Sequence, residues 1–564
     1  LTTDQLVALT TQQASAITAT QVKGFTTAQL SKLETQDLAA FTTSSVAGLS
    51  GAQLSGLTTD EIRSITTAQV SAITATALRS LTTAQIQALT SDQLPELTTA
   101  QFNALTTSQI DALTTAQISA LETADIAKLS YLQVIALNTA QMPQLTTAQV
   151  KAIDATLIQY IESQDLVRLT SDQVGALTTA QIQQLSVPQI VSFTTDQTSG
   201  LTGTQVASLN NVQLEAMETA DLAKLTSAAI AGLTTAQITA LNTAQVLALT
   251  TDQVVAITTA DFNVMTANQI RALSSDQVAA LSLDQIGLIK TADLAALTTT
   301  NVANLKPTQV AKLSTAQIQA LTTAHAAALT SAQLAELTTA QFASMETADF
   351  ASLSTSGIAG LTKAVIESMT TAQAAAMTAT EIVGFTNTQI QFIETADLKA
   401  ILPSNLTGLT TAQTVALTQN QVRALTSAQF AVMETADLAA LTGSHIGVLT
   451  SSQVGALSSA QITALTATQL PSFSLDGLQS ITPAGLSALS TAKIAALSDV
   501  QFGNLTTAQV NQLTTAQMQS LATSSKLSSI TGTQMAALSS AQLVALTSDQ
   551  WVALRKDQIN GLTS

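Results

Sequence analysis

An eight-residue repeat runs through this sequence and constrains its fold more than any other feature. With Leu1 as position one, every eighth residue through Leu521 is Leu, Ile, Phe or Met. The consensus octad is Leu, Thr/Ser, Thr/Ser, Ala, Gln, Ile/Val/Leu, any residue and Ala, as in residues 81–88. Such strict self-similarity indicates stacked copies of one structural unit, which bury a continuous core only when neighbours pack together.

The phase of the repeat changes once. Ile530 follows Leu521 by nine residues instead of eight, and the period then resumes at Leu538. We therefore expect an uninterrupted octapeptide-repeat solenoid over residues 1–521, a register break at residues 522–529, and continuing terminal repeats over residues 530–564.

Each octad must contain a bend, because neither regular secondary structure fits a period of eight. An α-helix turns about 100° per residue, so one continuous helix would spread the apolar positions one and six around its axis. A plain strand ladder also fails, since positions one, six and eight do not share one parity. The unit is therefore a short segment followed by a corner.

The consensus favours a short helix for that segment. Thr82 and Gln85 stand three residues apart at positions two and five, the spacing of a capping box. Leu81 and Ile86 occupy the two places that form a hydrophobic staple around such a cap. Proline occurs at position three, the first helical residue, where its missing amide costs nothing. These prolines are Pro307, Pro403 and Pro483.

Glycine at position eight fits the same frame, since a left-handed residue commonly ends a helix and favours glycine. Glycines at this position include Gly24, Gly48, Gly56, Gly232, Gly360, Gly384 and Gly408. The sequence thus predicts an α-solenoid of short, capped helical turns.

A β-solenoid remains an alternative. Pro95, Pro143 and Pro471 lie at position seven, where proline pushes its predecessor towards extended geometry, and position six is rich in β-branched residues. In either fold a single octad is unstable alone, so stacking must bury the Leu, the Ile or Val and the alanines. We consider two octads per coil for a helical solenoid and three for a β-solenoid.

Composition excludes several classes of protein. The chain has no cysteine, so neither disulfides nor thiolate metal sites hold it together. A net charge of −17 disfavours nucleic acid and anionic membrane surfaces as partners. No apolar stretch approaches the roughly 20 residues needed to span a bilayer. Because the sequence opens inside a repeat, we expect any secretion signal or cell-surface anchor to lie outside it.

No catalytic site is legible, and we expect no enzyme. His325 and His445, the only histidines, both replace the Gln of position five and are interpreted as capping substitutes. A nucleophile paired with a base is absent from the pattern, as is a Gly-rich phosphate loop.

Acidic octads are the one candidate for a metal site. In these octads Glu stands at position two and Asp at position five, where carboxylates favour a helix N-terminus. A second interpretation is that acidic turns on successive coils share Ca²⁺, a possible cofactor bound through oxygen. The candidate ligands are Asp37, Glu122, Asp125, Glu218, Asp221, Glu346, Asp349, Glu434 and Asp437, with Glu34, Glu394 and Asp397 in the same pattern.

A few residues depart from the consensus. Trp551 replaces the usual aliphatic residue at position six and, with Arg555 and Lys556 nearby, is a candidate for a terminal cap, a subunit contact or ordinary core. Tyr131, Tyr160 and Arg168 are departures that a local binding face would use.

Two resemblances bear on the fold and on location. Residues 249–257, Leu-Thr-Thr-Asp-Gln-Val-Val-Ala-Ile, resemble the opening of a transcription-activator-like effector repeat for nine residues, which implies that such a stretch can start a helix. That family's base-reading loop is missing here. Over its full length, the acidic, cysteine-free Thr/Ala-rich array resembles the secreted repeat proteins of Gram-negative bacteria, including surface-layer proteins and adhesin stalks.

This second resemblance implies an extracellular protein. Our leading hypothesis is a structural protein whose repeat rods associate with one another into a surface layer, sheath or filament, because identical faces recur along the chain. The alternative is an adhesin stalk or a solenoid that binds another protein.

Overall fold

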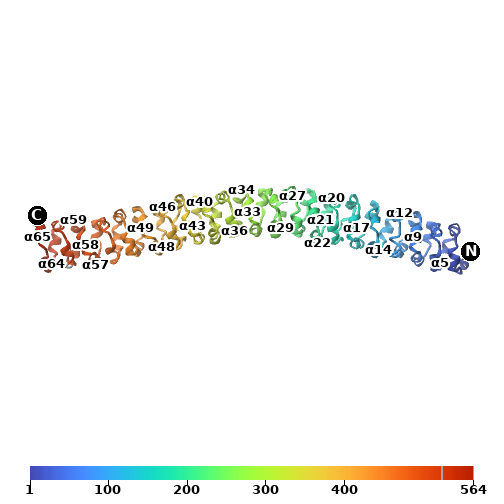
Figure 1. Cartoon of the computed structure of the whole chain (residues 1–564), viewed down its shortest axis with the longest axis horizontal. Coiled ribbons are helices and arrows are strands. Elements are labelled where there is room, and N and C mark those ends of the chain that lie inside the picture. The colour runs from blue at the N-terminus through green and yellow to red at the C-terminus, as the bar shows by residue number, and fades with distance from the viewer. Residues whose placement is uncertain (522–524, 563–564) are drawn as a thin grey trace. The chain divides into compact units, whose positions relative to one another are not determined.

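The structure is a computed structural model that describes residues 1–521 and 525–562. Over these ranges the chain forms the short helices α1 (Thr3–Val7) to α65 (Lys556–Gly561) and four 3-10 helices, with no β-strand (Figure 1). The protein is therefore an α-solenoid, and the β-solenoid alternative is wrong. The register break predicted at residues 522–529 lies partly outside the described residues.

A typical helix begins at position three of its octad and is four to six residues long. Examples are α9 (Thr67–Ala72), α11 (Thr83–Ala88) and α37 (Thr315–Gln319). Helix α29 (Thr251–Ala256) starts within the stretch that resembles a transcription-activator-like effector repeat, so that stretch does begin a helix. The 3-10 helices are η1 (Met142–Gln144), η2 (Ala155–Tyr160), η3 (Gln389–Phe392) and η4 (Leu470–Ser472).

The predicted capping box starts these helices. The backbone amide of Thr82 donates to Oε1 of Gln85 at 2.8 Å, and the amide of Gln85 donates to Oγ1 of Thr82 at 3.3 Å. Two amides that would otherwise lack a partner at the helix start are thereby bonded. Proline at position three begins a helix as predicted, in α36 (Pro307–Lys312), α47 (Pro403–Leu406) and α56 (Pro483–Ser487).

Proline at position seven, which favoured the β-solenoid alternative, shortens the helix of its octad. The octad of Pro95 forms only turns, and those of Pro143 and Pro471 form the 3-10 helices η1 and η4. The local effect of proline was thus interpreted correctly, but it is confined to its own octad.

The core contains positions one, five and six. In the octad of α11, Leu81 is 5% exposed, Ile86 is fully buried and Gln85 is 2% exposed, whereas Ala84 at position four is exposed. The expectation that alanine fills the core is therefore wrong for position four. A polar residue, the Gln of position five, takes a place in the interior.

The buried Gln side chains connect each coil to the one before it. Nε2 of Gln85 donates to the carbonyls of Leu54 at 2.8 Å and Leu57 at 2.6 Å, which lie 31 and 28 residues earlier. We call this recurring arrangement the glutamine ladder. Since a spacing of 28 to 31 residues corresponds to between three and four octads, one coil holds that many octads. The expectation of two octads per coil is wrong.

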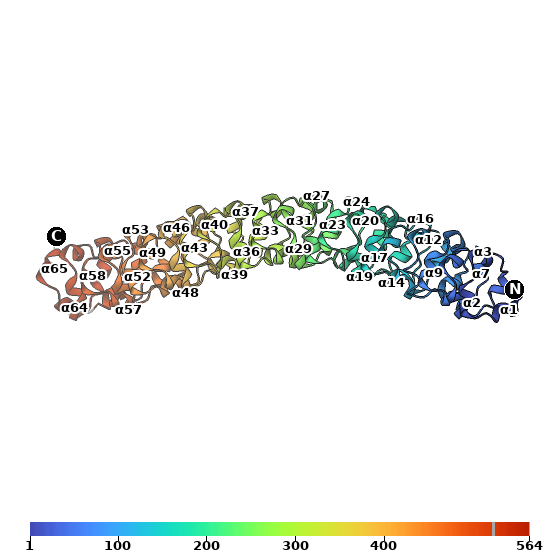
Figure 2. The same cartoon turned by 45° about the vertical axis from the view of Figure 1, so that its right-hand side comes forward.

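The same ladder runs through both parts of the chain. Contacts divide the solenoid into two compact units, Leu1–Leu281 and Ser282–Ser564, and in each unit the short helices follow one another along successive coils (Figure 2). In the second unit, Nε2 of Gln317 donates to the carbonyls of Ile286 at 3.0 Å and Ile289 at 2.8 Å. The octad register of the sequence continues across residues 281 and 282.

Glycine at position eight has another role than predicted. No described glycine has a positive φ, and Gly48 ends α6 (Thr43–Ala47) at φ −79°. A Cβ atom on Gly48 would lie 2.9 Å from the carbonyl oxygen of Ala19 in the preceding coil. Close approach of two coils, not left-handed geometry, is therefore what favours glycine here.

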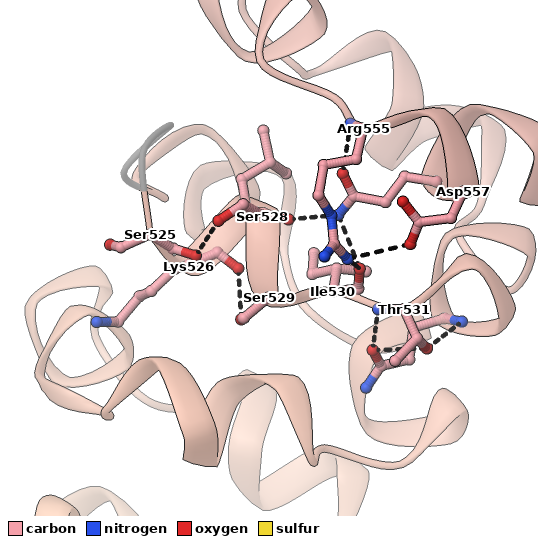
Figure 3. A network of polar contacts seen from close by, with 11 residues as sticks. Ser525, Lys526, Ser528, Ser529, Ile530, Thr531, Arg555 and Asp557 are labelled. Carbon is pink, nitrogen blue, oxygen red and sulfur yellow. Dashed lines mark hydrogen bonds and ion pairs between the residues drawn. The ribbon is translucent and has the colours of Figure 1, made fainter.

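The ladder absorbs the one-residue change of register near the C-terminal end of the sequence. Gln550 reaches the carbonyls of Met518 and Leu521, 32 and 29 residues earlier, which is one residue more than usual. Gln558 returns to the normal spacing and donates to Leu527 and Ile530, both at 2.7 Å. Figure 3 shows this region, where Arg555 also donates from Nη2 to the Ile530 carbonyl at 3.1 Å.

Candidate functional site

Position five is a buried place where histidine or a carboxylate replaces the usual Gln in some octads. A Gln there accepts a hydrogen bond at Oε1 from its own octad and donates from Nε2 to the preceding coil. A replacement reproduces the Gln only if it serves both an amide and the carbonyls of the preceding coil. The histidines and the Asp residues of the acidic octads occupy this position, and the Glu residues stand at position two of the same octads.

Both histidines reproduce the Gln, as predicted. Nδ1 of His325 accepts from the Thr322 amide at 3.4 Å while Nε2 faces the Leu297 carbonyl at 2.9 Å, 28 residues earlier. His445 accepts from the Thr442 amide in the same way. Burial lowers the pKa of His445, and a hydrogen bond to the backbone of Leu417 opposes that shift. Each imidazole is thus a structural member of the ladder.

The acidic octads place one carboxylate inside and one outside. Glu at position two is the N-cap residue but makes no capping hydrogen bond with its side chain, in helices such as α15 (Thr123–Ile126) and α25 (Thr219–Leu222). Asp at position five is buried in every case. The buried carboxylates are Asp37, Asp125, Asp221, Asp349, Asp397 and Asp437, each at most 4% exposed.

A carboxylate at this place cannot donate to the preceding coil, and several lack hydrogen bonds. Both carboxylate oxygens of Asp37, and Oδ2 of Asp125 and of Asp349, are buried without a hydrogen-bond partner. Burial raises the pKa of these three carboxyls, and the charge of the Glu at position two of the same octad adds to the rise. The same two causes raise the pKa of Asp397 to about 6.

The acidic octads do not gather into a metal site in the part of the chain that the structure describes. Glu122 with Asp125, Glu218 with Asp221, Glu346 with Asp349 and Glu434 with Asp437 each share one octad. Within residues 1–521 and 525–562, no three His, Asp or Glu side chains form a group that could hold a metal ion. Within these ranges the structure therefore brings no three of the candidate calcium ligands together.

Two of the three departures from consensus do meet. Tyr131 on α16 (Tyr131–Ile135) and Tyr160 on η2 lie edge to face, with ring centroids 4.5 Å apart. Both rings remain more than 40% exposed. Arg168 is exposed after α18 (Ser163–Leu166) and takes no part in this ring contact. The sequence pattern thus located an exposed aromatic pair.

The residues around Trp551 form a separate cluster. Trp551 on α64 (Ser548–Val552) is 42% exposed, and Ile559 at position six of the next octad is 48% exposed, whereas position six is buried in earlier octads such as that of Met535. Arg555 pairs with Asp557 at 3.2 Å, and Lys556 begins α65 (Figure 3). The exposure of Trp551 argues against ordinary core, and it is shared with Ile559, so it belongs to the last described octads and not to the Trp alone.

Sequence reasoning missed the interior role of the position-five Gln, although the sequence holds a signal for it. Glu closes a capping box as well as Gln does, yet Glu occurs at position five only as Glu61 and Glu381. The excess of Gln indicates that the amide NH₂ group is needed as a donor, a need that the cap alone does not create.

A comparison with known families agrees with the repeat seen in the structure. Fourteen segments match the ALTTAQ repeat, namely residues 30–67, 62–99, 94–123, 118–154, 158–195, 214–251, 254–288, 288–323, 310–345, 342–379, 390–427, 430–467, 478–515 and 528–564. Together they cover far more than half of the sequence. The chain belongs to the ALTTAQ repeat family. The family name is spelled out by residues 112–117, which run from position eight of one octad to position five of the next.

Further comparison adds little beyond the ALTTAQ family. No curated protein matches the chain. Among the described residues, none of the helices has both the length and the apolar character required to cross a membrane. An all-helical solenoid built from one ALTTAQ octad favours a structural rather than a catalytic protein.

Proposed function

We propose that this ALTTAQ repeat protein is a structural, extracellular protein that associates with copies of itself into a surface layer, sheath or filament. The proposal extends the resemblance of its composition to secreted repeat proteins of Gram-negative bacteria. Under it the chain is not an enzyme, and its first partner is a second copy.

The observation that carries the proposal is the repetition of one outer surface. In the octad of α11, Thr82, Thr83, Ala84 and Gln87 at positions two, three, four and seven are exposed, and these positions recur along each unit. A contact between two unlike faces of such a surface can be repeated many times. Contacts of this heterologous kind propagate into open arrays instead of closing into rings.

Electron microscopy of the purified 564-residue chain tests self-association. Negatively stained samples over a range of protein concentrations, each with and without added Ca²⁺, are expected to contain sheets, tubes or filaments with a regular repeat. Assembly only in the presence of Ca²⁺ would assign the ion a place between copies. Dispersed single particles under all of these conditions contradict the proposal.

The second candidate is a protein-binding module or adhesin stalk, and the exposed pair of Tyr131 and Tyr160 favours it. Aromatic side chains that remain exposed are frequent at the centres of protein interfaces. Removing whole octads step by step separates the two candidates. Assembly that declines in proportion to the octads removed supports the structural role, whereas binding lost with the segment around Tyr131 and Tyr160 supports the module.

A further inference from the structure

Two grooves on the surface of the unit Leu1–Leu281 have the same construction but different charge. Each is lined by parts of four octads from successive coils. The acidic groove is lined by Thr107, Ser108, Asp111, Ile135, Ala136, Leu137, Asn138, Thr139, Glu162, Gln164 and Asp165. The counterpart groove is lined by Thr147, Ala148, Lys151, Gly175, Ala176, Leu177, Thr178, Thr179, Thr202, Thr204 and Gln205.

Every lining residue of the counterpart groove lies 40 residues, or five octads, after its equivalent in the acidic groove. The shared frame therefore isolates the effect of the side chains. The acidic groove carries Asp111, Glu162 and Asp165 and no basic residue among those that line it. In the counterpart, the same three places hold Lys151, Thr202 and Gln205.

The base of the counterpart groove is closed by the glutamine ladder. Nε2 of Gln205 donates to the carbonyls of Val174 at 2.9 Å and Leu177 at 2.7 Å. In the acidic groove Asp165 stands at the same position, so the carbonyls of Val134 and Leu137 receive no donor from the ladder. The Asp165 side chain is only 5% exposed, and its carboxylate accepts no hydrogen bond from the described residues.

The other two carboxylates are held at the edges of the acidic groove. Nε2 of Gln164 donates to Oε2 of Glu162 at 2.6 Å, and Nδ2 of Asn138 donates to Oδ1 of Asp111 at 2.8 Å. Burial raises the pKa of Asp165, and the nearby charge of Glu162 adds to the rise. The acidic groove thus collects negative charge and acceptor oxygens around one unbonded, buried carboxylate.

Such a lining needs a ligand that brings both positive charge and several hydrogen-bond donors. The three carboxylates do not lie close enough together to hold a metal ion, since no such group of three occurs among the described residues. An ammonium or guanidinium group supplies three or more N–H donors on a side chain long enough to reach a recessed carboxylate. Pairing with a cation would also offset the cost of leaving Asp165 charged in a buried place.

We propose that the acidic groove binds a lysine or arginine side chain from a basic segment of a partner protein. The net charge of −17 favours a partner segment of opposite charge for this groove. This binding site is independent of the self-association proposed above, since it uses residues particular to one place in the repeat.

Zero-length cross-linking tests the location of binding. The probe is a short peptide of alternating glycine and lysine with blocked ends, coupled by a carbodiimide to the full chain and mapped by mass spectrometry. We expect the lysine to be joined to Asp111, Glu162 or Asp165 ahead of exposed carboxylates such as Asp172 and Asp196. Coupling that follows exposure alone, with no preference for the acidic groove, overturns the proposal.

Fluorescence anisotropy of the labelled peptide tests the energetics. Replacing Glu162→Thr and Asp165→Gln installs the side chains that the counterpart groove has at these two places, and it restores the Thr and Gln of the capping box seen at Thr202 and Gln205. We expect about tenfold weaker binding, because a charge-assisted hydrogen bond is lost at the base of the groove.

The matched control changes the same net charge elsewhere in the unit. Asp172→Gln with Asp196→Thr removes two exposed carboxylates from the starts of α19 (Ser171–Ala176) and α22 (Thr195–Ser199). We expect less than a twofold change for this control. Equal weakening by both pairs of substitutions would mean that only net charge attracts the peptide, and unchanged binding in the groove variant would exclude the site.

Discussion

At the scale of single residues, stability depends on a Gln that has two roles. Gln85→Glu keeps the acceptor that closes the capping box but removes the donor to Leu54 and Leu57 and buries a charge. We expect the local free energy of unfolding of this coil to fall by ~2 to 3 kcal/mol, since two buried carbonyls lose their hydrogen-bond donor. Hydrogen exchange of the octads of Leu54, Leu57 and Gln85 measures it.

Two further substitutions make the prediction for Gln85 specific. Gln85→His should cost less than Gln85→Glu, because His325 and His445 occupy the same position with both nitrogens placed like the Gln amide. Gln87→Glu, at exposed position seven of the same helix, should change stability by less than about 0.5 kcal/mol. If Gln87→Glu and Gln85→Glu accelerate exchange alike, the ladder is not what stabilises the coil.

Buried Asp residues at position five make the solenoid sensitive to pH. The pKa of Asp397 is raised from 3.8 to about 6, mainly by burial, so the folded state binds this proton more tightly than the unfolded state does. The stability that the protonated form contributes is fully present below pH about 4 and is lost as pH rises through about 6. We expect the amides of α46 (Thr395–Ala400) to be better protected at pH 5 than at pH 7.5, after correction for intrinsic exchange.

Replacing the carboxyl with an amide isolates the contribution of Asp397. Asp397→Asn should remove most of the difference in protection between pH 5 and pH 7.5. Asp476→Asn, an exposed position on α55 (Leu475–Gln479), serves as the control and should leave the difference unchanged. A pH dependence that persists in Asp397→Asn would assign it to other groups.

At the scale of the helix, proline at position seven keeps its octad from completing an α-helical turn. The octad of Pro95 has an intact capping box, in which the Thr90 amide donates to Oε1 of Gln93 at 2.8 Å, yet it forms only turns. Pro95→Ala should therefore let residues 91–96 become helical, with new protection of the amides at residues 95 and 96 in hydrogen exchange. Pro307→Ala, at the first residue of α36, should change no protection beyond that helix.

The helices were largely predictable because their causes lie within eight residues. The cap of Thr82 and Gln85 and the proline start at Pro307 are local in sequence and were found from the repeat alone. The number of octads per coil, the donor role of Gln85 and the reason for Gly48 were missed. Each depends on contacts 28 to 31 residues away, and a repeat in which every octad looks alike does not identify which earlier octad is the neighbour.

The candidate sites also divide into those that a local signal predicts and those that depend on contacts between coils. The histidines were assigned correctly, since their role as caps is local. The acidic groove was not foreseen, because Asp111, Asn138 and Glu162 meet only once the length of a coil is known. Tyr131 and Tyr160 could be selected as departures from the consensus, but their ring contact required the coil spacing as well.

At the scale of the whole molecule, register is what the sequence has to preserve. The ladder tolerates one additional residue, since Gln542 and Gln550 bond 29 and 32 residues back and Gln558 returns to 28 and 31. A repeat array of this kind has a stability that is roughly the sum of octad and interface terms. Changes that keep equivalent positions in contact should therefore lower the stability little, whereas changes that shift these positions should lower it more.

Deleting whole and partial octads from the second unit tests this rule. Removing residues 313–320 leaves every later Gln facing positions six and one of an earlier octad, so the helix content per residue and the exchange protection of α38 (Thr323–Ala328) and α39 (Ser331–Ala335) should be unchanged. Removing only residues 313–316 moves the ladder by half an octad and should expose amides in each octad of the coil that spans the deletion. The stability should fall by ~1 kcal/mol for each hydrogen bond lost.

A single alanine inserted after Ala320 should resemble the whole-octad deletion, because the chain already accommodates one such shift between Leu521 and Ile530. Equal loss of protection for whole and partial deletions would mean that the identity of individual octads, and not their common register, holds the coils together.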